Sequence, residues 1–508
     1  MIGHHTVINI SQKIRYLQSL GLSQAKLKTT FGMKLTFWGA AQQVTGSMFL
    51  LTLESEYNIL IDCGMDMAHG EAVETAHYGL FPFEASQIHA VVLTHAHLDH
   101  SGFLPNLIRE GFEGKIYCTA PTRDLTQLLL EDAASLNMRK LKRAEKEKYR
   151  ARNKKRGFSP DINTDRLYML PHVASALSHF EVVPFSQRIR LTKDAWLTLL
   201  PAGHLLGAAS VVIEVKEGEE TKRLCFSGDV GRFNYPLLPD PHPMPQVDYL
   251  ISESTYGSRR HEDTESPEKL LYDIIKEACI DKPGKLIIPA FSVGRTQALL
   301  YTLKKLCAQG LMPPIKIYAD SPLAFMSTKV YAHYPKWLNQ EAQDFLKQNT
   351  ELFDFENLIY VENMRDSKTL ATQREACVII SSSGMIHGGR VEHHVRKNLS
   401  NPNATILMIG YAAEGTLGHE LLNGRKSLEI AKNKEVPVLA NIRKIDIFSG
   451  HGDLDDLLYF VRQQPTDQLK KVFLVHGEVN AMQDFRQTLA QEGYTQVEVP
   501  QKGDAFEL

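Results

Sequence analysis

The sequence predicts an α/β fold, and three observations lead to it. Short apolar runs rich in β-branched residues alternate with stretches of helical periodicity along most of the 508 residues. Between about residues 256 and 430 this alternation is regular, which indicates a parallel sheet. Several other apolar runs end in a glycine-containing turn that carries a histidine or a carboxylate, where the backbone can approach an ion closely.

The composition is that of a globular protein. Apolar residues make up 43% and charged residues 23% of the chain, so large cores can be buried. The net charge of −2 does not decide about nucleic acid, because local patches matter more. Six scattered cysteines without a Cys-x-x-Cys pair fit free thiols in a reducing compartment. No apolar run approaches the roughly 20 residues of a membrane span, so we expect a cytoplasmic protein that binds no membrane.

Residues 1–32 are expected to be an extension outside the main fold. They are basic, and no Asp or Glu precedes Glu54, a composition that transit peptides share. A start at Met33 is favoured, because a strand-like run follows it directly. Short strands are then expected up to Asp62. Two interpretations of Asp62 stay open: a buried turn residue, or a carboxylate that orients a metal-bound histidine or water.

The densest signal follows the apolar run at residues 90–94, which predicts a buried strand. Four metal-ligand side chains come within the next six residues: His95, His97, Asp99 and His100. Imidazole and carboxylate without thiolate suit zinc, and less often manganese or iron. A chance polar turn is the alternative interpretation. The whole string favours a metal site, with the first two histidines on one ion and the other two residues available for a second.

Later strands are expected to end in the same kind of residue. Singly, such residues are more often structural, but their repetition after strand and glycine favours a common site. In chain order they are His204, Asp229, Glu253, His451 and His476.

The segment from Arg139 to Arg156 holds eleven Lys or Arg residues and two Glu. It follows a predicted helix at residues 121–138. Two interpretations stay open: a solvated helix face, or a contact to a phosphate backbone.

The regular strand-helix region contains two candidate phosphate contacts. Arg295 lies at a strand-to-helix turn, where it can clamp a phosphate with two hydrogen bonds or form a surface salt bridge. A second turn of this kind can bind phosphate through backbone N–H groups at a helix start, although it is not a Walker sequence. Its residues are Ser381, Ser382, Ser383 and Gly384.

Seven motifs, taken in chain order, resemble those of a known family. LIDCG, THAHLDHSG, PAGHLLGAAS and FSGDVGR are similar to the metal motifs of metallo-β-lactamase-fold hydrolases. ESTYG, FSGHGDL and VHGE are similar to three further motifs of the β-CASP nucleases. The resemblance covers residues 33–508. It is closest to bacterial and archaeal homologues of the endonuclease subunit of the eukaryotic cleavage and polyadenylation machinery.

The resemblance implies a fold, domain limits and residue roles. The fold is a metallo-β-lactamase αββα sandwich with an inserted β-CASP parallel-sheet α/β domain. The expected limits are 1–32 for the extension, 33–255 and 431–508 for the sandwich, and 256–430 for the insertion. Glu253 would orient His451, which would protonate the leaving group. The implied ligands are His95, His97 and His204 for one zinc ion, Asp99, His100 and His476 for a second, and Asp229 between the two.

The implied activity is that of a zinc-dependent ribonuclease with two ions per chain. Its partner would be single-stranded RNA in processing or decay, with a homodimer left open. Asp99 and Asp229 would take the proton of the attacking water, leaving a 5′-phosphate and a 3′-hydroxyl. His476 favours RNA, because the DNA-repair branch has valine there. Endonuclease and 5′–3′ exonuclease action stay open. The alternatives are a hydrolase or phosphodiesterase acting on a small molecule or DNA, and an inactive scaffold.

Overall fold

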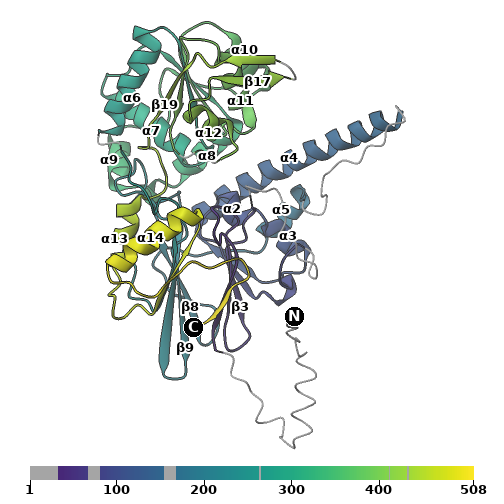
Figure 1. The fold of residues 1–508 in the computed structure, drawn as a ribbon, viewed down its shortest axis with the longest axis vertical. Helices are drawn as coiled ribbons and strands as arrows, with labels where there is room; N and C mark the ends of the chain where they lie inside the picture. Colours follow the sequence, from purple (N-terminus) through teal and green to yellow (C-terminus); the bar gives the residue numbers. More distant parts are fainter. Residues whose placement is uncertain are drawn as a thin grey trace, which may run out of the picture.

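The computed structural model describes residues 32–66, 80–153, 167–262, 265–410, 412, 414–431 and 434–508. The predicted extension therefore lies outside the described residues, except for Gly32, as do the last three residues of the basic segment, 154–156. Two lobes lie one above the other in Figure 1. The lower lobe contains both chain ends of the described part and two mixed sheets that face each other.

Each sheet of the lower lobe has seven strands. The first sheet, in spatial order, consists of β22 (Ala505–Glu507), β1 (Lys34–Gly39), β2 (Met48–Thr52), β3 (Asn58–Ile61), β4 (Ala90–Val92), β5 (Lys115–Cys118) and β6 (Phe180–Val182). The second consists of β21 (Val497–Glu498), β20 (Lys471–Val475), β11 (Tyr249–Glu253), β10 (Glu220–Phe226), β9 (Ala209–Glu217), β8 (Ala195–Pro201) and β7 (Ile189–Arg190). The strands next to the site, β3–β4 and β10–β11–β20, run parallel.

Apolar side chains fill the space between the two sheets, as the alternation along each strand predicts. Phe37 of β1 and Phe473 of β20 meet there with ring centroids 5.1 Å apart. Helices cover both outer faces, which gives four layers and confirms the predicted αββα sandwich. These helices are α2 (Leu98–Ser101), α3 (Leu104–Arg109), α4 (Ala120–Asn153), α5 (Leu170–Leu177), α13 (Leu454–Arg462) and α14 (Val479–Gln491), with a 3-10 turn η2 (Ala85–Gln87).

The upper lobe is built on a parallel sheet of six strands. Three of its central strands are buried along their whole length, because helices cover both faces of such a sheet. In spatial order the six strands are β14 (Leu358–Tyr360), β13 (Lys316–Asp320), β15 (Cys377–Ser381), β12 (Lys285–Pro289), β16 (Thr405–Met408) and β19 (Asn441–Lys444). The helices are α6 (Pro267–Ile275), α7 (Arg295–Ala308), α8 (Pro322–His333), α9 (Gln340–Gln348), α10 (Met364–Thr372), α11 (Gly389–Asn398) and α12 (Leu417–Leu422), with the short turns η4 (Lys276–Asp281) and η5 (Pro335–Trp337) and a hairpin of β17 (Ser427–Ala431) and β18 (Lys434–Pro437).

The last strand of this sheet lies beyond the residue at which we expected the insertion to end. Asn441 to Lys444 pair with β16, although they follow residue 430. A strand that begins at Arg443 and leads into His451 was expected, but β19 ends at Lys444 and belongs to the sheet of the upper lobe. The hydrogen-bonding edge of β16 decides this placement, and an apolar run alone does not reveal it.

The lobes share one hydrophobic core. Leu205 and Leu206, directly after His204, belong to the same buried cluster as Ile288 of β12 and Leu299 of α7. Polar contacts also cross between the lobes: the Leu206 amide donates to the Tyr331 hydroxyl at 3.3 Å, and the Tyr334 hydroxyl donates to Asp124 at 2.6 Å. The insertion therefore packs on the loop that carries a predicted metal ligand.

Helix α4 extends the helix predicted at residues 121–138 by about four further turns. It passes beside α8 and α5 and then runs outward past both lobes (Figure 1). All six cysteines are unpaired, as expected, and five of them are buried. Among the described residues, no helix combines the length and the apolar character needed to cross a membrane.

Candidate metal centre

The predicted ligand side chains come together at one edge of the sandwich. Each follows the carboxyl end of a strand: β4, β8, β10 and β20 are followed by His95, His204, Asp229 and His476. Because β10, β11 and β20 run parallel and adjacent, their ends meet at the same edge. The end of β4 in the facing sheet lies at this edge too, and His100 and His476, more than 370 positions apart, lie 3.3 Å from each other there.

The first group of ligand atoms consists of three imidazoles and one carboxylate. His97 Nδ1 lies 3.1 Å from His95 Nε2 and 3.2 Å from His204 Nε2. Asp229 Oδ2 lies 3.5 Å from His95 Nε2 and 3.4 Å from His204 Nε2. Donor atoms of a tetrahedral zinc ion with bonds of about 2.0–2.1 Å are separated by roughly 3.3 Å. The spacing of this group fits such an ion.

The second group consists of Asp99, His100 and His476. His476 Nε2 lies 3.3 Å from His100 Nε2 and 3.5 Å from Asp99 Oδ2. Asp229 Oδ1 completes the group, at 3.3 Å from His100 Nε2 and 3.6 Å from His476 Nε2. These distances again fit a tetrahedral arrangement.

Asp229 faces both groups, one through each carboxylate oxygen. The side chain is buried, and its Oδ1 atom has no hydrogen-bond partner. A buried carboxylate oxygen without a partner is costly, so a cation is the natural occupant of the space beside it. The residues present therefore fit two ions that share this carboxylate.

Hydrogen bonds on the outer side fix two histidines of the first group. The Nδ1–H of His204 donates to the Gly450 carbonyl at 2.9 Å. His95 Nδ1 lies 3.2 Å from the Thr94 hydroxyl, which itself donates elsewhere and can accept this proton. Both contacts leave Nε2 unprotonated toward the group, which is the tautomer that a metal needs.

The second group is held in the same way. The Nδ1–H of His100 donates to Asp62 Oδ2 at 2.7 Å, and His476 Nδ1 lies 3.1 Å from the Thr255 hydroxyl. Asp62 also accepts hydrogen bonds from the amide and the hydroxyl of Thr94, both at 2.8 Å. Of the two interpretations of Asp62, this geometry favours the carboxylate that orients a histidine.

Burial and charge act differently on the two groups. Burial lowers the pKa of His97 to about 4 and holds the pKa of His95 and His204 well below the usual value, so these imidazoles are neutral near pH 7. For His100 burial acts in the same direction, but the carboxylates of Asp229 and Asp62 outweigh it and raise the pKa. A cation that binds there takes the place of a proton.

His451 lies beside the first group and is only 15% exposed. Its Nδ1 atom is 3.2 Å from Glu253 Oε1 and 4.0 Å from Asp229 Oδ2. Glu253 is fully buried at the end of β11 and also accepts the Val230 amide at 2.6 Å. The Glu253 carboxylate therefore fixes the His451 ring, and Nε2 has no hydrogen-bond partner among the described residues.

The close packing of this edge requires small residues and unusual backbone. A Cβ atom on Gly64 would lie 1.7 Å from the Asp99 carbonyl oxygen, so only glycine fits. Asp62 and His476 adopt positive φ angles of 59° and 49°, a conformation that costs on the order of 1–3 kcal/mol outside glycine. Backbone strain at two functional side chains is consistent with a site whose geometry matters more than local stability.

The candidate phosphate contacts lie at the carboxyl ends of the upper sheet. Arg295 begins α7, is 8% exposed, and stacks over the Phe291 ring at 4.8 Å. The serine turn lies beside it, since Gly384 packs against the same ring. Helix α11 begins only at Gly389, and both Gly388 before it and Gly389 itself have positive φ, so the helix does not start directly after Gly384 as expected.

The serine side chains form hydrogen bonds within the upper lobe. Ser381 donates to the Asp320 carbonyl at 3.0 Å, Ser382 donates to the Ser321 hydroxyl at 3.1 Å, and Ser383 donates to the His387 carbonyl at 3.0 Å. Any contact of this turn to a ligand would therefore depend mainly on its backbone.

Several residues that hold the site were not found from the sequence. Thr94 and Thr255 occur beside predicted ligands, and their proximity was the available signal. Tyr256 belongs to the ESTYG motif but had no predicted role, and His261 carries no such signal. His261 Nε2 lies 3.1 Å from the His451 carbonyl, and the Tyr256 ring packs edge-on against His451 at 6.0 Å.

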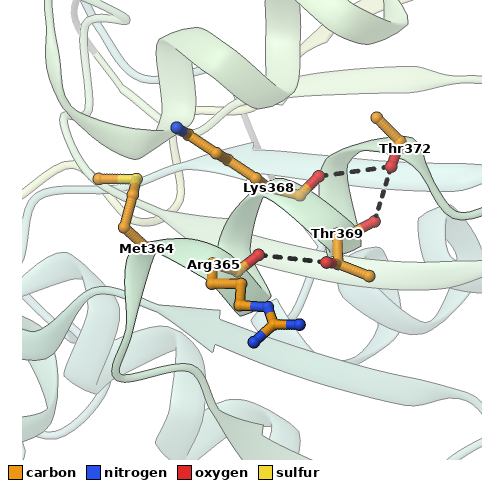
Figure 2. Close-up of a pocket in the computed structure, with 5 residues that line it drawn as sticks. All are labelled: Met364, Arg365, Lys368, Thr369 and Thr372. Atoms are coloured by element: carbon orange, nitrogen blue, oxygen red, sulfur yellow. Dashed lines mark hydrogen bonds between the residues drawn. The ribbon is translucent and has the colours of Figure 1, made fainter.

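A large surface hollow, of about 490 Å³, lies elsewhere on the upper lobe. Figure 2 shows that a single helix, α10, lines it with Met364, Arg365, Lys368, Thr369 and Thr372. The threonine hydroxyls donate back to carbonyls of the same helix. None of these side chains belongs to the metal centre, and the hollow has no part in the chemistry below.

The fold and the two groups of ligands define a metal-dependent hydrolase. The family model of the metallo-β-lactamase superfamily matches residues 42–272, and the β-CASP domain model matches residues 296–421. A third model, the Zn-dependent metallo-hydrolase RNA specificity domain, matches residues 435–500. The chain thus belongs to the β-CASP family within the metallo-β-lactamase superfamily, as its motifs predicted.

Three similar proteins have names that describe an activity. Ribonuclease TTHA0252 of Thermus thermophilus is 33% identical over 461 residues, covering 91% of this chain and 97% of that protein. The transcription termination factor FttA of Methanocaldococcus jannaschii is 30% identical, and the alignment covers 94% of this chain and 72% of that protein. An RNase J-like protein of the same organism is also 30% identical, with 90% and 95% covered.

Proposed function

We propose that this chain is a zinc-dependent ribonuclease that hydrolyses phosphodiester bonds of single-stranded RNA. The observation that carries the proposal is the position of Asp229. One of its carboxylate oxygens faces the first group of ligand side chains, and the other faces the second group. Two ions held a few ångströms apart suit the attacking and leaving oxygens of an in-line displacement at phosphorus. The zinc-dependent family model and the two relatives named as ribonuclease or RNase J-like support the same activity.

The ligand assignment follows the two groups. We assign one zinc ion to each, with Asp229 shared between them. The first ion takes His95, His97 and His204, and the second takes Asp99, His100 and His476. When bound, zinc lowers the pKa of a water toward about 7 and stabilises charge on the phosphate.

The side chains of the centre supply the proton transfers. Asp229 and Asp99 lie among the ligands and can accept the proton of the attacking water. The departing ribose 3′ oxygen needs a proton, and His451 Nε2 is free to give it, because Glu253 holds Nδ1. The products are a 5′-phosphate and a 3′-hydroxyl. Because water is the nucleophile, the 2′-hydroxyl takes no part, and the preference for RNA depends on binding contacts.

Arg295 is our candidate for such a contact. The residue is only 8% exposed, yet it forms no ion pair with a described side chain. It lies near Tyr235. Burial raises the pKa of Tyr235 to about 12, although the positive charges of Arg295 and Arg232 act in the opposite direction. The Tyr235 hydroxyl donates to the Phe448 carbonyl at 3.2 Å, three residues before His451. A buried cation that has no ion-pair partner among the described side chains, at this junction of the lobes, fits a phosphate of the RNA.

Arg295→Gln is therefore expected to lower kcat/KM for RNA by roughly 10- to 100-fold, the range of a lost charge-assisted hydrogen bond. The fall in kcat/KM should come mainly from a higher KM, and the zinc content of the protein should not change. Arg295→Lys keeps the charge but not the two-pronged geometry, so it should recover only part of the loss. Equal kinetics of wild type and Arg295→Gln would show that this residue does not bind substrate.

The test of the proposed function combines metal analysis and digestion. Protein purified without added metal should contain about two zinc ions per chain, the number that two ligand groups require. It should cut single-stranded RNA, supplied with a 5′ label and with internal label, and leave single-stranded DNA largely intact. Internal fragments indicate endonuclease action, and mononucleotides released from the 5′ end indicate exonuclease action. Hydrolysis of DNA or small phosphodiesters in place of RNA would refute the proposal.

Two further expectations remain part of this proposal. We keep 33–255 as the first part of the sandwich and residue 256 as the start of the insertion, and we move the end of the insertion from residue 430 to residue 444, because β19 pairs with β16 in the upper sheet. The six unpaired cysteines support a cytoplasmic location.

A further inference from the structure

The outer half of α4, from Met138 onward, leaves the body of the protein in the part of the chain that the structure describes. The inner half is buried, with Leu125, Leu130 and Ala134 in apolar contacts. From Met138 onward none of the described side chains of the helix is buried. Figure 1 shows this half extending beyond both lobes. A helix that leaves the body of the protein is not stabilised by burial of apolar side chains. Its exposed side chains are therefore the place to look for a role.

Four cations line one face of this outer half of α4. Arg139, Lys142, Arg143 and Lys146 each lie three or four residues from two others of the set, so they share one face of the helix. All four are exposed. Like charges at this spacing destabilise a helix. We call these four residues, together with Tyr149, the α4 cationic stripe.

Tyr149 continues the same face three residues after Lys146. Its side chain is 68% exposed, which is unusual for a large aromatic ring on a helix. Alternating cations and aromatic rings are the combination with which proteins hold single-stranded nucleic acid, through phosphate contacts and base stacking.

The charges of the stripe are available to a partner. Among the described side chains, none forms an ion pair with Lys142, Arg143 or Lys146. Arg139, at the inner end, lies close enough to Asp132 to lower its pKa against the effect of burial. The test below therefore leaves Arg139 unchanged.

The inner end of α4 is tied to the metal centre. The hydroxyls of Thr119 and Thr122 donate to the Gly207 carbonyl at 2.7 and 2.9 Å, three residues after His204. At 1.5 Å per residue, Lys142 lies about 30 Å along the helix from Thr122. The stripe is thus held at a fixed distance from the reacting atoms.

We infer that the α4 cationic stripe binds the phosphate backbone of single-stranded RNA outside the site, with Tyr149 stacked on a base. This inference rests on the proposed ribonuclease function and deepens it. The stripe holds RNA that extends beyond the centre and raises its local concentration there, without reading sequence. An RNA too short to span about 30 Å does not reach both places.

The test compares two variants that lose the same charge. Lys142→Gln, Arg143→Gln and Lys146→Gln are combined in one protein, because glutamine preserves helix propensity. The control combines Lys34→Gln, Lys193→Gln and Lys216→Gln, which are exposed on the strands and turns of the lower lobe. For each zinc-loaded protein, kcat/KM is measured at several salt concentrations on a long unstructured RNA and on a dinucleotide.

On the long RNA the stripe variant should have a shallower dependence of log kcat/KM on log salt, by about 0.7 per lost phosphate contact and so about two in total. Its dinucleotide cleavage should equal that of wild type, and the control should match wild type on both substrates. A stripe variant with the salt slope of the control overturns the inference. Failure of wild type to cleave either RNA refutes the proposed function instead.

Tyr149 gives an independent measurement. Tyr149→Ala should weaken binding of the long RNA by roughly 5- to 100-fold, the range for one lost stacked base, and leave the salt slope unchanged. Tyr149→Phe, which keeps the ring, should bind as wild type does. Normal RNA binding by Tyr149→Ala overturns the stacking part. Loss of binding to polyglutamate in the stripe variant, with RNA binding intact, would assign the surface to an acidic protein.

Discussion

Asp229→Asn is expected to remove most of the bound zinc and to lower ribonuclease activity by at least roughly 10³-fold. A metal centre stabilises charge in the transition state by several kcal/mol, and each 1.36 kcal/mol is a factor of ten. Both carboxylate oxygens of Asp229 lie 3.3–3.6 Å from imidazole nitrogens of two groups. An amide offers one oxygen, and it carries no charge. Zinc per chain and the cleavage rate of labelled RNA are the measurements.

Asp62→Asn is the matched control. It makes the same change from carboxylate to amide, but at a residue that contacts a proposed ligand and not the proposed ion. Asp62 touches the outer nitrogen of His100 and no other imidazole. Loss of such a supporting contact typically lowers metal affinity 10- to 100-fold, so excess zinc should restore much of the activity. Excess zinc should not rescue Asp229→Asn. Full zinc content and full activity in Asp229→Asn, with an unchanged circular dichroism spectrum, would contradict the shared-carboxylate centre.

His451→Ala is expected to lower the rate of RNA hydrolysis by roughly 10²–10⁴-fold, the usual contribution of a positioned general acid. The ribose oxygen leaves as an alkoxide and depends strongly on that proton. A nitrophenyl phosphodiester releases a stable nitrophenolate, so the same variant should lose far less on this substrate. The ratio of the two losses, at equal zinc content, measures assistance to the leaving group.

Two further variants serve as comparisons for His451→Ala. His95→Ala should damage both reactions, because it disturbs the centre that activates water. Glu253→Gln should resemble His451→Ala in a weaker form, since Glu253 Oε1 fixes the ring at 3.2 Å but does not itself give the proton. Equal losses on both substrates in His451→Ala would show that this histidine is not the acid.

The fold was largely predictable because its signals are local. Apolar runs and the residues that follow them fix the strands and the ligand-bearing turns. Strand β19 and the outer part of α4 were harder to predict. The placement of Asn441–Lys444 depends on the free edge of β16, and the length of α4 depends on helix propensity in a segment without an apolar face.

The site divides in a similar way. The proposed ligand residues were visible as histidines and carboxylates at strand ends, and the structure brings all seven together. The contacts that orient them were not visible. His204 is held by the Gly450 carbonyl and His451 by His261, over separations of 246 and 190 residues. A carbonyl has no sequence signature, and only the packed fold creates such neighbours.

The apolar core common to both lobes limits what can enter. Swinging the lobes apart as rigid halves would bring Leu205, Leu206 and their partners into water, at about 1.5–3 kcal/mol for each fully exposed leucine. The two lobes are therefore held at a nearly fixed spacing beside the metal centre. If the proposed function holds, we expect an unpaired RNA strand, which can change its shape, to reach the centre more readily than a rigid base-paired stem. Selection of unpaired RNA would then begin with shape, before any base or phosphate is bound.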